Sequence, residues 1–225
     1  MNIIYMVQVK PKGGLCNKLR VVFSYYEYAL SINSDLNVIW GKSNACPGYF
    51  LDYFDPIPRV HFVKSEKKVD YVGCQWHPNF NPYRKYIYDK LRLKPELEKI
   101  IYDKINILNK NYISVHIRRT DHVGFAKKKN IYTTDEEFIN FIDKYDSDKM
   151  IYISTDNKNT YEKFKKKYPK RIIFDYHQTN DNSLRKTSLK DAIIDIYMCV
   201  HSNDFMGSSY SSFSDFIKHL RKNRN

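Results

Sequence analysis

Residues 112–121 read YISVHIRRTD, an apolar strand that passes directly into a polar turn. Side chains alternate between the two faces of a strand, so His116 and Arg118 should share one face, and Ile117 and Arg119 the other. An arginine at a strand end suits a diphosphate, because its guanidinium donates two hydrogen bonds and keeps its charge. The adjacent Asp121 could hold that arginine in place. The alternative is an Arg–Asp salt bridge that merely closes the sheet end.

Strands and helices alternate after this stretch. We predict strands over 112–117, 150–154, 171–174 and 204–206, and helices over 134–144, 157–168, 184–199 and 211–221. This alternation is typical of right-handed βαβ units around a parallel sheet. Upstream, strands are expected over 3–9, 36–40, 59–63 and 69–73, a helix after residue 17, and mainly helix over 82–109, with Pro95 in a first helical turn. The chain is therefore predicted to be an α/β protein with two Rossmann-like lobes, 1–109 and 110–225.

Four polar clusters fall at the predicted carboxyl ends of strands, where parallel sheets bind their ligands: 13–17, 116–121, 154–156 and 208–212. At the first, Gly13 and Gly14 let backbone N–H groups turn toward a ligand at a helix N-terminus. Asn17 either caps that helix or reaches the ligand. At the last, Ser211 and Ser212 offer a phosphate seat, or simple N-capping.

Asp195 lies within an apolar helical run, so its carboxylate must be paired or hydrogen-bonded. It could accept from the N1–H and amino groups of a guanine, or from a neighbouring arginine.

Composition excludes several classes of protein. The chain has 225 residues, 42% of them hydrophobic, and a net charge of +13, which favours an anionic ligand. The lysine runs 127–129 and 165–167 are interpreted as solvated surface, so nucleic acid is not the expected partner. Four cysteines without a Cys-x-x-Cys pair argue against a zinc site or a disulfide framework. No signal peptide and no apolar run of about 18 residues is present, so a cytoplasmic protein without a membrane span is expected.

Together these motifs resemble those of the α1,6-fucosyltransferases, both the core-fucosylating and the rhizobial Nod-factor enzymes. Residues 115–124 resemble their first donor-binding motif. Residues 151–156 with 165–169 resemble the second, and 188–196 with 203–212 the third. The order and approximate spacing also match, so the resemblance covers 112–221. Residues 13–20 are similar to a turn common in fucosyltransferase-like sequences.

The resemblance implies a GT-B-like fold with a donor cleft between the lobes, GDP-fucose as donor, a glycan hydroxyl as acceptor, inversion at the anomeric carbon, and no metal or other cofactor. By position, Arg118 would bind the β-phosphate and stabilise the departing GDP. His116 and Asp195 would lie against the guanine, and Ser211 and Ser212 against the phosphates. Gly14, Asn17 and Asp156 complete the donor-binding residues that we expect.

Two positions depart from the family pattern. A lysine and, four residues later, a glutamate proposed as the base are replaced here by His122 and Ala126. His122 is the predicted catalytic replacement, since its pKa is naturally near neutrality. Asp121, Asp52 and Asp55 remain open alternatives.

Three further features have alternative interpretations. Asp146-Ser-Asp148 is formally the manganese motif of another glycosyltransferase class, but we expect a surface turn there. Trp76 could stack on an acceptor sugar or anchor a loop. The loss of the glutamate favours another function, a degenerate module that binds a nucleotide, a glycan or nucleic acid. Transfer from another nucleotide sugar also stays open, because the sequence does not fix which sugar is carried.

Overall fold

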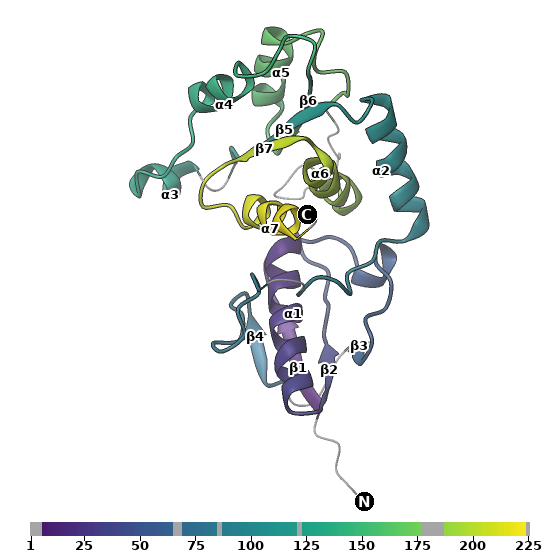
Figure 1. Ribbon diagram of the computed structural model, residues 1–225. Helices are drawn as coiled ribbons and strands as arrows, with labels where there is room; N and C mark the ends of the chain where they lie inside the picture. Colours follow the sequence, from purple (N-terminus) through teal and green to yellow (C-terminus); the bar gives the residue numbers. More distant parts are fainter. Residues whose placement is uncertain (1–5, 65–68, 85–86, 121–122, 177–186, 224–225) are drawn as a thin grey trace, which may run out of the picture. The chain divides into compact units, whose positions relative to one another are not determined.

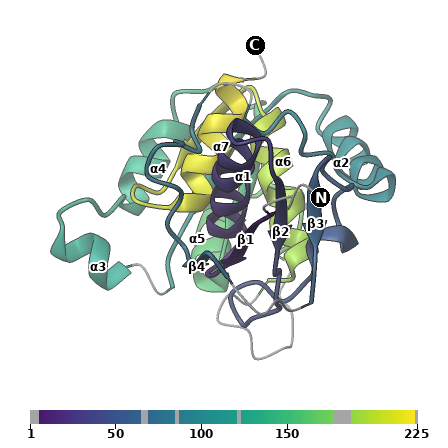
Figure 2. The ribbon, with the colours of Figure 1, turned by 90° about the horizontal axis from the view of Figure 1, so that it is seen from below.

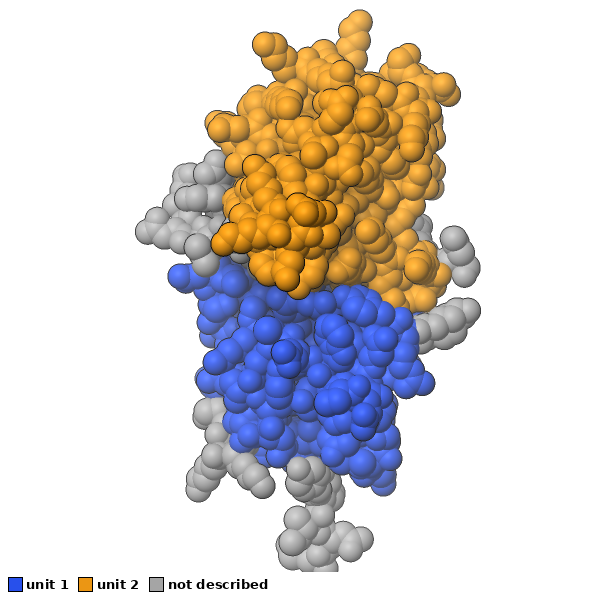
Figure 3. All heavy atoms as spheres, turned by 90° about the vertical axis from the view of Figure 1, so that its left-hand side faces the viewer, with its two compact units in different colours: residues 1–95 blue, residues 96–225 orange. Residues whose placement is uncertain are grey.

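The computed structural model describes residues 6–64, 69–84, 87–120, 123–176 and 187–223. The chain divides into two compact units, Met1–Pro95 and Glu96–Asn225, which are coloured separately in Figure 3. The predicted lobes meet at residue 109 instead. The difference is helix α2, Pro95–Ile107, nearly all of which groups with the second unit.

Unit 1 is a parallel sheet with one long helix beside it (Figures 1 and 2). Its strands are β1 (Met6–Pro11), β2 (Asp35–Val38), β3 (Val60–Phe62) and β4 (Tyr71–Gly73), in the order β3-β2-β1-β4. Helix α1 (Leu15–Ser31) packs on β1 and β2 through an apolar face, and a 3-10 helix, η1, covers Phe50–Asp52. All three strand pairings are parallel, so the four carboxyl ends share one edge.

Unit 2 holds a second parallel sheet, in the order β6-β5-β7. Its strands are β5 (Tyr112–Ile117), β6 (Met150–Thr155) and β7 (Asp204–Gly207). Besides α2, its helices are α3 (Val123–Lys128), α4 (Asp135–Ile142), α5 (Lys158–Lys167), α6 (Leu189–His201) and α7 (Ser212–Lys222). Figures 1 and 2 both show α3 projecting away from the rest of this unit.

The two faces of β5 carry different chemistry. Ile113, Val115 and Ile117 face an apolar cluster that includes side chains of α4 and α5. The alternate residues bond toward α6 and α7: the Tyr112 hydroxyl donates to the Met198 carbonyl at 2.7 Å, and the Ser114 and Ser202 hydroxyls lie 2.7 Å apart. The sheet is therefore the middle of three layers, as Figure 1 shows. This arrangement explains why a fully buried strand alternates apolar with polar residues.

Most of the predicted elements form, with ends shifted by a few residues, but two predictions were wrong. Residues 171–174 are not a strand: the Arg171 carbonyl accepts one sheet-like bond, from Ile151 N at 2.8 Å, and residues 172–174 are not assigned to a strand. The described residues between 82 and 94 form turns and one isolated bridge, and the helix begins only at Pro95. None of the described helices is long and apolar enough to cross a membrane.

Candidate functional site

The carboxyl edge of the unit 2 sheet gathers the segments that follow its three strands: 118–120 after β5, 156–157 after β6, and 208–211 after β7. Asp156 is the centre of this edge. One carboxylate oxygen accepts from Arg119 N at 2.8 Å, and the other accepts from the Thr120 hydroxyl at 2.5 Å and lies 3.1 Å from Arg118 Nη1. Both oxygens of the Asp156 carboxylate therefore bind groups of the protein, namely the turn after β5 and the Arg118 guanidinium.

Arg118 is positioned from two sides. Its backbone N–H donates to the Ser208 hydroxyl at 2.9 Å, while the Ser208 N–H donates to the His116 carbonyl at 2.9 Å, which ties the end of β5 to the turn after β7. The Arg118 side chain is 11% exposed and its partner Asp156 is 6% exposed. A guanidinium fixed in this way is ready to meet an anion without losing further side-chain freedom.

Arg119 has a structural role. Its Nη2 lies 2.7 Å from an Asp135 oxygen, and its guanidinium stands over the rings of Tyr132 and Phe138, on the α4 side of the sheet. Arg119 therefore lies on the α4 side of the sheet, as the alternation of side chains along the strand predicts. Both arginines form salt bridges at this end of the sheet, Arg118 with Asp156 and Arg119 with Asp135.

The turn after β7 is built from hydroxyls. The Ser209 N–H donates to the Thr133 hydroxyl at 2.9 Å, and Tyr210 adopts a positive φ of 55° directly before α7. Ser211 caps α7, because its hydroxyl accepts from Ser214 N at 3.4 Å. The next residue, Ser212, begins the helix, where backbone N–H groups lack intrahelical partners and carry partial positive charge.

These groups surround a small cavity of about 10 Å³, which has room for roughly one water molecule. Arg118, Ser208, Ser209 and Ser211 line it, as does Ala126, which is buried. The described residues of this lining include neither a carboxylate nor a histidine. The described part of the lining therefore offers donors to an anion but no carboxylate or imidazole that could accept a proton.

His116 lies on the α6–α7 face of β5. Its Nδ1 is 2.7 Å from the Ser214 hydroxyl, and its ring stacks on Phe213 with centroids 4.5 Å apart. His116 pairs in register with Ser154, which in turn donates to Asp195 at 2.8 Å. Through Ser154, Asp195 of helix α6 is thus connected to the face of the sheet that carries His116. Whether the two residues lie around one base stays a prediction.

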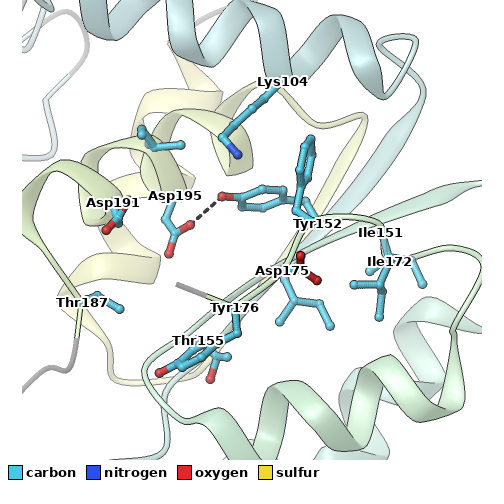
Figure 4. A pocket seen from close by; sticks show the side chains of 13 residues that line it. Lys104, Ile151, Tyr152, Thr155, Ile172, Asp175, Tyr176, Thr187, Asp191 and Asp195 are labelled. Carbon is cyan, nitrogen blue, oxygen red and sulfur yellow. Dashed lines mark hydrogen bonds between the residues drawn. The ribbon is translucent and has the colours of Figure 1, made fainter. Parts of the chain in front are cut away.

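Asp195 projects from α6 into a cavity of about 60 Å³ at the β6 edge (Figure 4). Its two oxygens accept from the Tyr152 hydroxyl at 2.6 Å and the Ser154 hydroxyl at 2.8 Å, not from an arginine. Burial raises the pKa of Asp195 to about 6, against the lowering effect of these two hydrogen bonds. Lys104 of α2 reaches toward the same cavity (Figure 4). Each carboxylate oxygen keeps a second lone pair for a ligand.

Gly14 and Asn17 belong to unit 1. Gly14 is itself the N-cap of α1, without a side-chain cap, so Asn17 does not cap the helix. The Asn17 amide oxygen accepts from Arg20, while its amide nitrogen would lie 3.0 Å from a Cβ at Gly13, whose φ is +85°. The Asn17 amino group therefore lies over the Gly-Gly turn, the side from which we expect a ligand.

The remaining predicted residues divide into three groups. Asp121 and His122 lie outside the described residues. Asp55 pairs with Lys94 at 3.2 Å, whereas Asp52 is exposed in unit 1. Asp146 to Asp148 form an exposed turn, as predicted, and within the described ranges no group of three or more His, Cys, Asp or Glu side chains could hold a metal ion.

Trp76 is partly exposed, with the Arg20 guanidinium over its ring at 5.3 Å, so it is neither fully free nor a buried anchor.

Sequence reasoning missed the supporting residues Thr133, Phe213, Ser214 and Tyr152. A period of two along β6 could have paired Tyr152 with Ser154 on one face. Nothing local in the sequence marks Thr133, whose partner is 76 residues away.

Comparisons with known proteins identify the family and the fold. The family described as GDP-fucose protein O-fucosyltransferase matches residues 18–224. No curated protein matches the sequence.

Three solved structures share the fold. One is the NodZ α-1,6-fucosyltransferase soaked with GDP-fucose, with a TM-score of 0.68 at 14% identity, covering 96% of this chain and 92% of that one. Another is the NodZ fucosyltransferase from Bradyrhizobium, with a TM-score of 0.67 at 13% identity, covering 95% and 91%. The third is POFUT1 in complex with GDP, with a TM-score of 0.68 at 10% identity, covering 100% and 96%. The predicted GT-B-like α/β fold is thereby confirmed.

Proposed function

The chain belongs to the GDP-fucose protein O-fucosyltransferase family and is a glycosyltransferase, and we propose that it transfers fucose from GDP-fucose to a glycan hydroxyl with inversion at the anomeric carbon. The observation that carries this proposal is the convergence of Arg118, the turn after β7 and the N-terminus of α7 at one sheet edge. NodZ and POFUT1, which share the fold, have been solved with GDP or GDP-fucose.

The diphosphate end of the donor is assigned to Arg118 and the start of α7. As the bond to fucose breaks, negative charge grows on the β-phosphate, and a fixed guanidinium with a helix N-terminus stabilises charge that develops there. Asp156 acts as a positioning residue, since its oxygens hold Arg118 and the turn. In this scheme protein cations balance the leaving group, and the reaction needs no metal ion.

The guanine end is assigned to the face that carries His116 and Asp195. The Asp195 carboxylate, held by Tyr152 and Ser154, offers two acceptors to the N1–H and amino groups of guanine, which adenine lacks in that pattern. His116 is buried on the same face, with its ring against Phe213, and would form part of the wall behind the base. Gly14 and Asn17 of unit 1 remain predicted donor contacts.

The residue that accepts the proton of the acceptor hydroxyl remains a prediction. Ala126 occupies the position of the family's glutamate and contributes only a methyl group to the cavity wall. His122 is the proposed base, with Asp121, Asp52 and Asp55 as alternatives. Replacing each in turn identifies the base as the residue whose loss slows transfer while leaving GDP affinity unchanged.

Calorimetry with GDP tests the donor site. Arg118→Ala should weaken GDP binding by roughly 10- to 100-fold, because a charge-assisted hydrogen bond contributes about 1.5–3 kcal/mol. Arg84→Ala is the matched control, since Arg84 pairs with Glu27 on the surface of unit 1. Equal GDP affinities for wild type and Arg118→Ala, or no GDP binding at all, would refute the proposed donor site.

An assay of GDP release tests the chemistry. Release of GDP from GDP-fucose, alone and with glycans, should occur at the same rate with and without a chelator. A rate that collapses on chelation and returns with a divalent ion contradicts the metal-free scheme.

The second candidate function is a nucleotide-binding module without catalysis, which the methyl group of Ala126 in the cavity wall favours. GDP binding without any turnover of GDP-fucose would select it.

A further inference from the structure

Unit 1 contains a cavity that the donor scheme does not use. It lies at the carboxyl ends of β2 and β3 and has a volume of about 640 Å³, within the range of about 300–1,000 Å³ that small-molecule sites span. We call it the aromatic cavity, and the residues that matter for its chemistry are Trp40, Gly41, Tyr49, Asp52, Phe62 and Lys64.

Its floor is rigid. The Trp40 indole N–H donates to the Gly48 carbonyl at 3.1 Å, and the rings of Phe50 and Phe62 stack with centroids 4.4 Å apart and an angle of 12° between them. Phe50 also stacks on Phe54 at 4.9 Å. Because these rings are already fixed, a ligand that enters does not have to order them, which lowers the cost of binding.

Its wall exposes an aromatic ring. Tyr49 is 50% exposed, and the Lys42 ammonium lies 4.4 Å from the ring centroid, which holds the ring in place. A half-exposed tyrosine in the wall of a cavity gives an apolar flat surface with a polar tip. This combination suits a ligand that has both a C–H face and hydroxyl groups.

The polar groups around the cavity complete this pattern. An Asp52 oxygen accepts from Tyr49 N at 3.2 Å, so the carboxylate is oriented beside the ring, and Lys64 adds an ammonium donor. A carboxylate accepts from neighbouring hydroxyls, and an ammonium donates to them. A purely apolar chain would give these two groups nothing to bond, and a folded protein partner would need a contact surface of about 800 Å² rather than a cavity.

We propose that the aromatic cavity binds a pyranose saccharide, which stacks its C–H face on Tyr49 and hydrogen-bonds Asp52 and Lys64 through its hydroxyls. In so far as this saccharide is the acceptor glycan, the inference rests on the proposed function. The binding itself requires neither the donor nor unit 2.

Binding is measured by saturation-transfer NMR without any nucleotide, with a panel of disaccharides of gluco, galacto, manno and N-acetylglucosamine configuration. At least one should bind the wild-type chain. Tyr49→Ala should weaken that binding about three- to tenfold through loss of stacking. Tyr102→Ala is the matched control, because Tyr102 is 53% exposed on α2 and should leave binding unchanged.

Gly41→Trp is a second, independent perturbation. A Cβ at Gly41 meets no heavy atom within 4 Å, so a side chain can begin there without a clash. Because Gly41 lines the cavity, the indole should occupy part of it and abolish saccharide binding. Circular dichroism and GDP calorimetry verify that each variant is folded. The inference is overturned if no saccharide in the panel binds, or if Tyr49→Ala and Gly41→Trp both bind like wild type. Saccharide binding without GDP binding supports the cavity and refutes the donor site, whereas GDP binding without saccharide binding does the reverse.

Discussion

Replacing Asp195 with asparagine should raise the stability of the protein relative to wild type more at neutral pH than at acid pH. The same substitution should weaken nucleotide binding. Burial raises the pKa of Asp195 from 3.8 to about 6. An acid with a raised pKa in the folded state binds its proton more tightly there than in the unfolded chain. Its contribution to the free energy of unfolding is therefore most favourable below about pH 4, declines between pH 4 and 6, and stays at its lower value above pH 6.

The size of this effect follows from the pKa difference. The rise in pKa from 3.8 to about 6 corresponds to at most about 3 kcal/mol of unfolding free energy. Because Asp195 is not fully buried, we expect roughly 2 kcal/mol. The asparagine of the Asp195→Asn variant carries no charge, so the difference in unfolding free energy between variant and wild type should shift by about 2 kcal/mol in favour of the variant between about pH 4 and pH 7.5. The hydrogen bonds from Tyr152 and Ser154 lower the folded-state pKa of Asp195 and are therefore already contained in the pKa difference, whereas those of an asparagine do not change with pH.

Urea unfolding followed by circular dichroism at about pH 4 and pH 7.5 measures the shift. Asp146→Asn is the control, because Asp146 is exposed in a turn and should show no such change. The reasoning about burial is refuted if the stability difference for Asp195→Asn is the same at both pH values. Calorimetry adds an independent readout: an asparagine NH₂ faces the guanine donors with another donor, so GDP affinity should fall about tenfold or more. Unchanged affinity would remove Asp195 from the guanine site.

Three further substitutions test the frame of the site, each by urea unfolding. Asp156→Asn removes the counter-charge of Arg118 and should cost about 3 kcal/mol or more, because a buried guanidinium loses the carboxylate that balances it; a loss below about 1 kcal/mol would contradict this. Gly207→Ala should cost about 1–3 kcal/mol, since its Cβ would lie 2.6 Å from Ser214 Cβ; wild-type stability would mean that α7 can move away freely. Gly13→Ala should cost about 1–2 kcal/mol because of its φ of +85°, and a stabilised variant would show that this turn can relax.

Periodicity predicted the elements in which apolar and polar side chains recur at a regular spacing. The strand β5 has the predicted bounds, and α7 is displaced by one residue. In each element the apolar side chains that contact the core recur at the period of a strand or a helix, and this period is visible in the sequence. The predicted strand over 171–174 was wrong because the pattern reports burial and not hydrogen bonding. Its residues Arg171 and Ile172 are buried, but burial beside a strand does not require a ladder of hydrogen bonds, and only one sheet-like bond forms.

The location of the site could be predicted from the sequence, but the hydrogen-bonding partners of its residues could not. Parallel strands bring their carboxyl ends to one edge whatever the side chains are, so the clusters after β5, β6 and β7 had to meet. Which polar group holds another depends on partners far apart in the sequence. Asp156 lies 37 residues from Arg119, and Ser208 lies 90 residues from Arg118. Single-sequence patterns carry no information about such pairs.

The structural roles of these polar groups narrow the chemistry that unit 2 can perform. Asp156 is committed to Arg118 and the turn, and the Ser211 hydroxyl is committed to the cap of α7. The described lining of the small cavity then presents a guanidinium, hydroxyls and backbone donors, all of which stabilise an anion and none of which readily removes a proton. Unit 2 is accordingly suited to the departure of GDP, and activation of the acceptor must depend on groups outside that lining. The transfer rate should therefore respond to two separable sets of substitutions, those that change GDP affinity and those that do not.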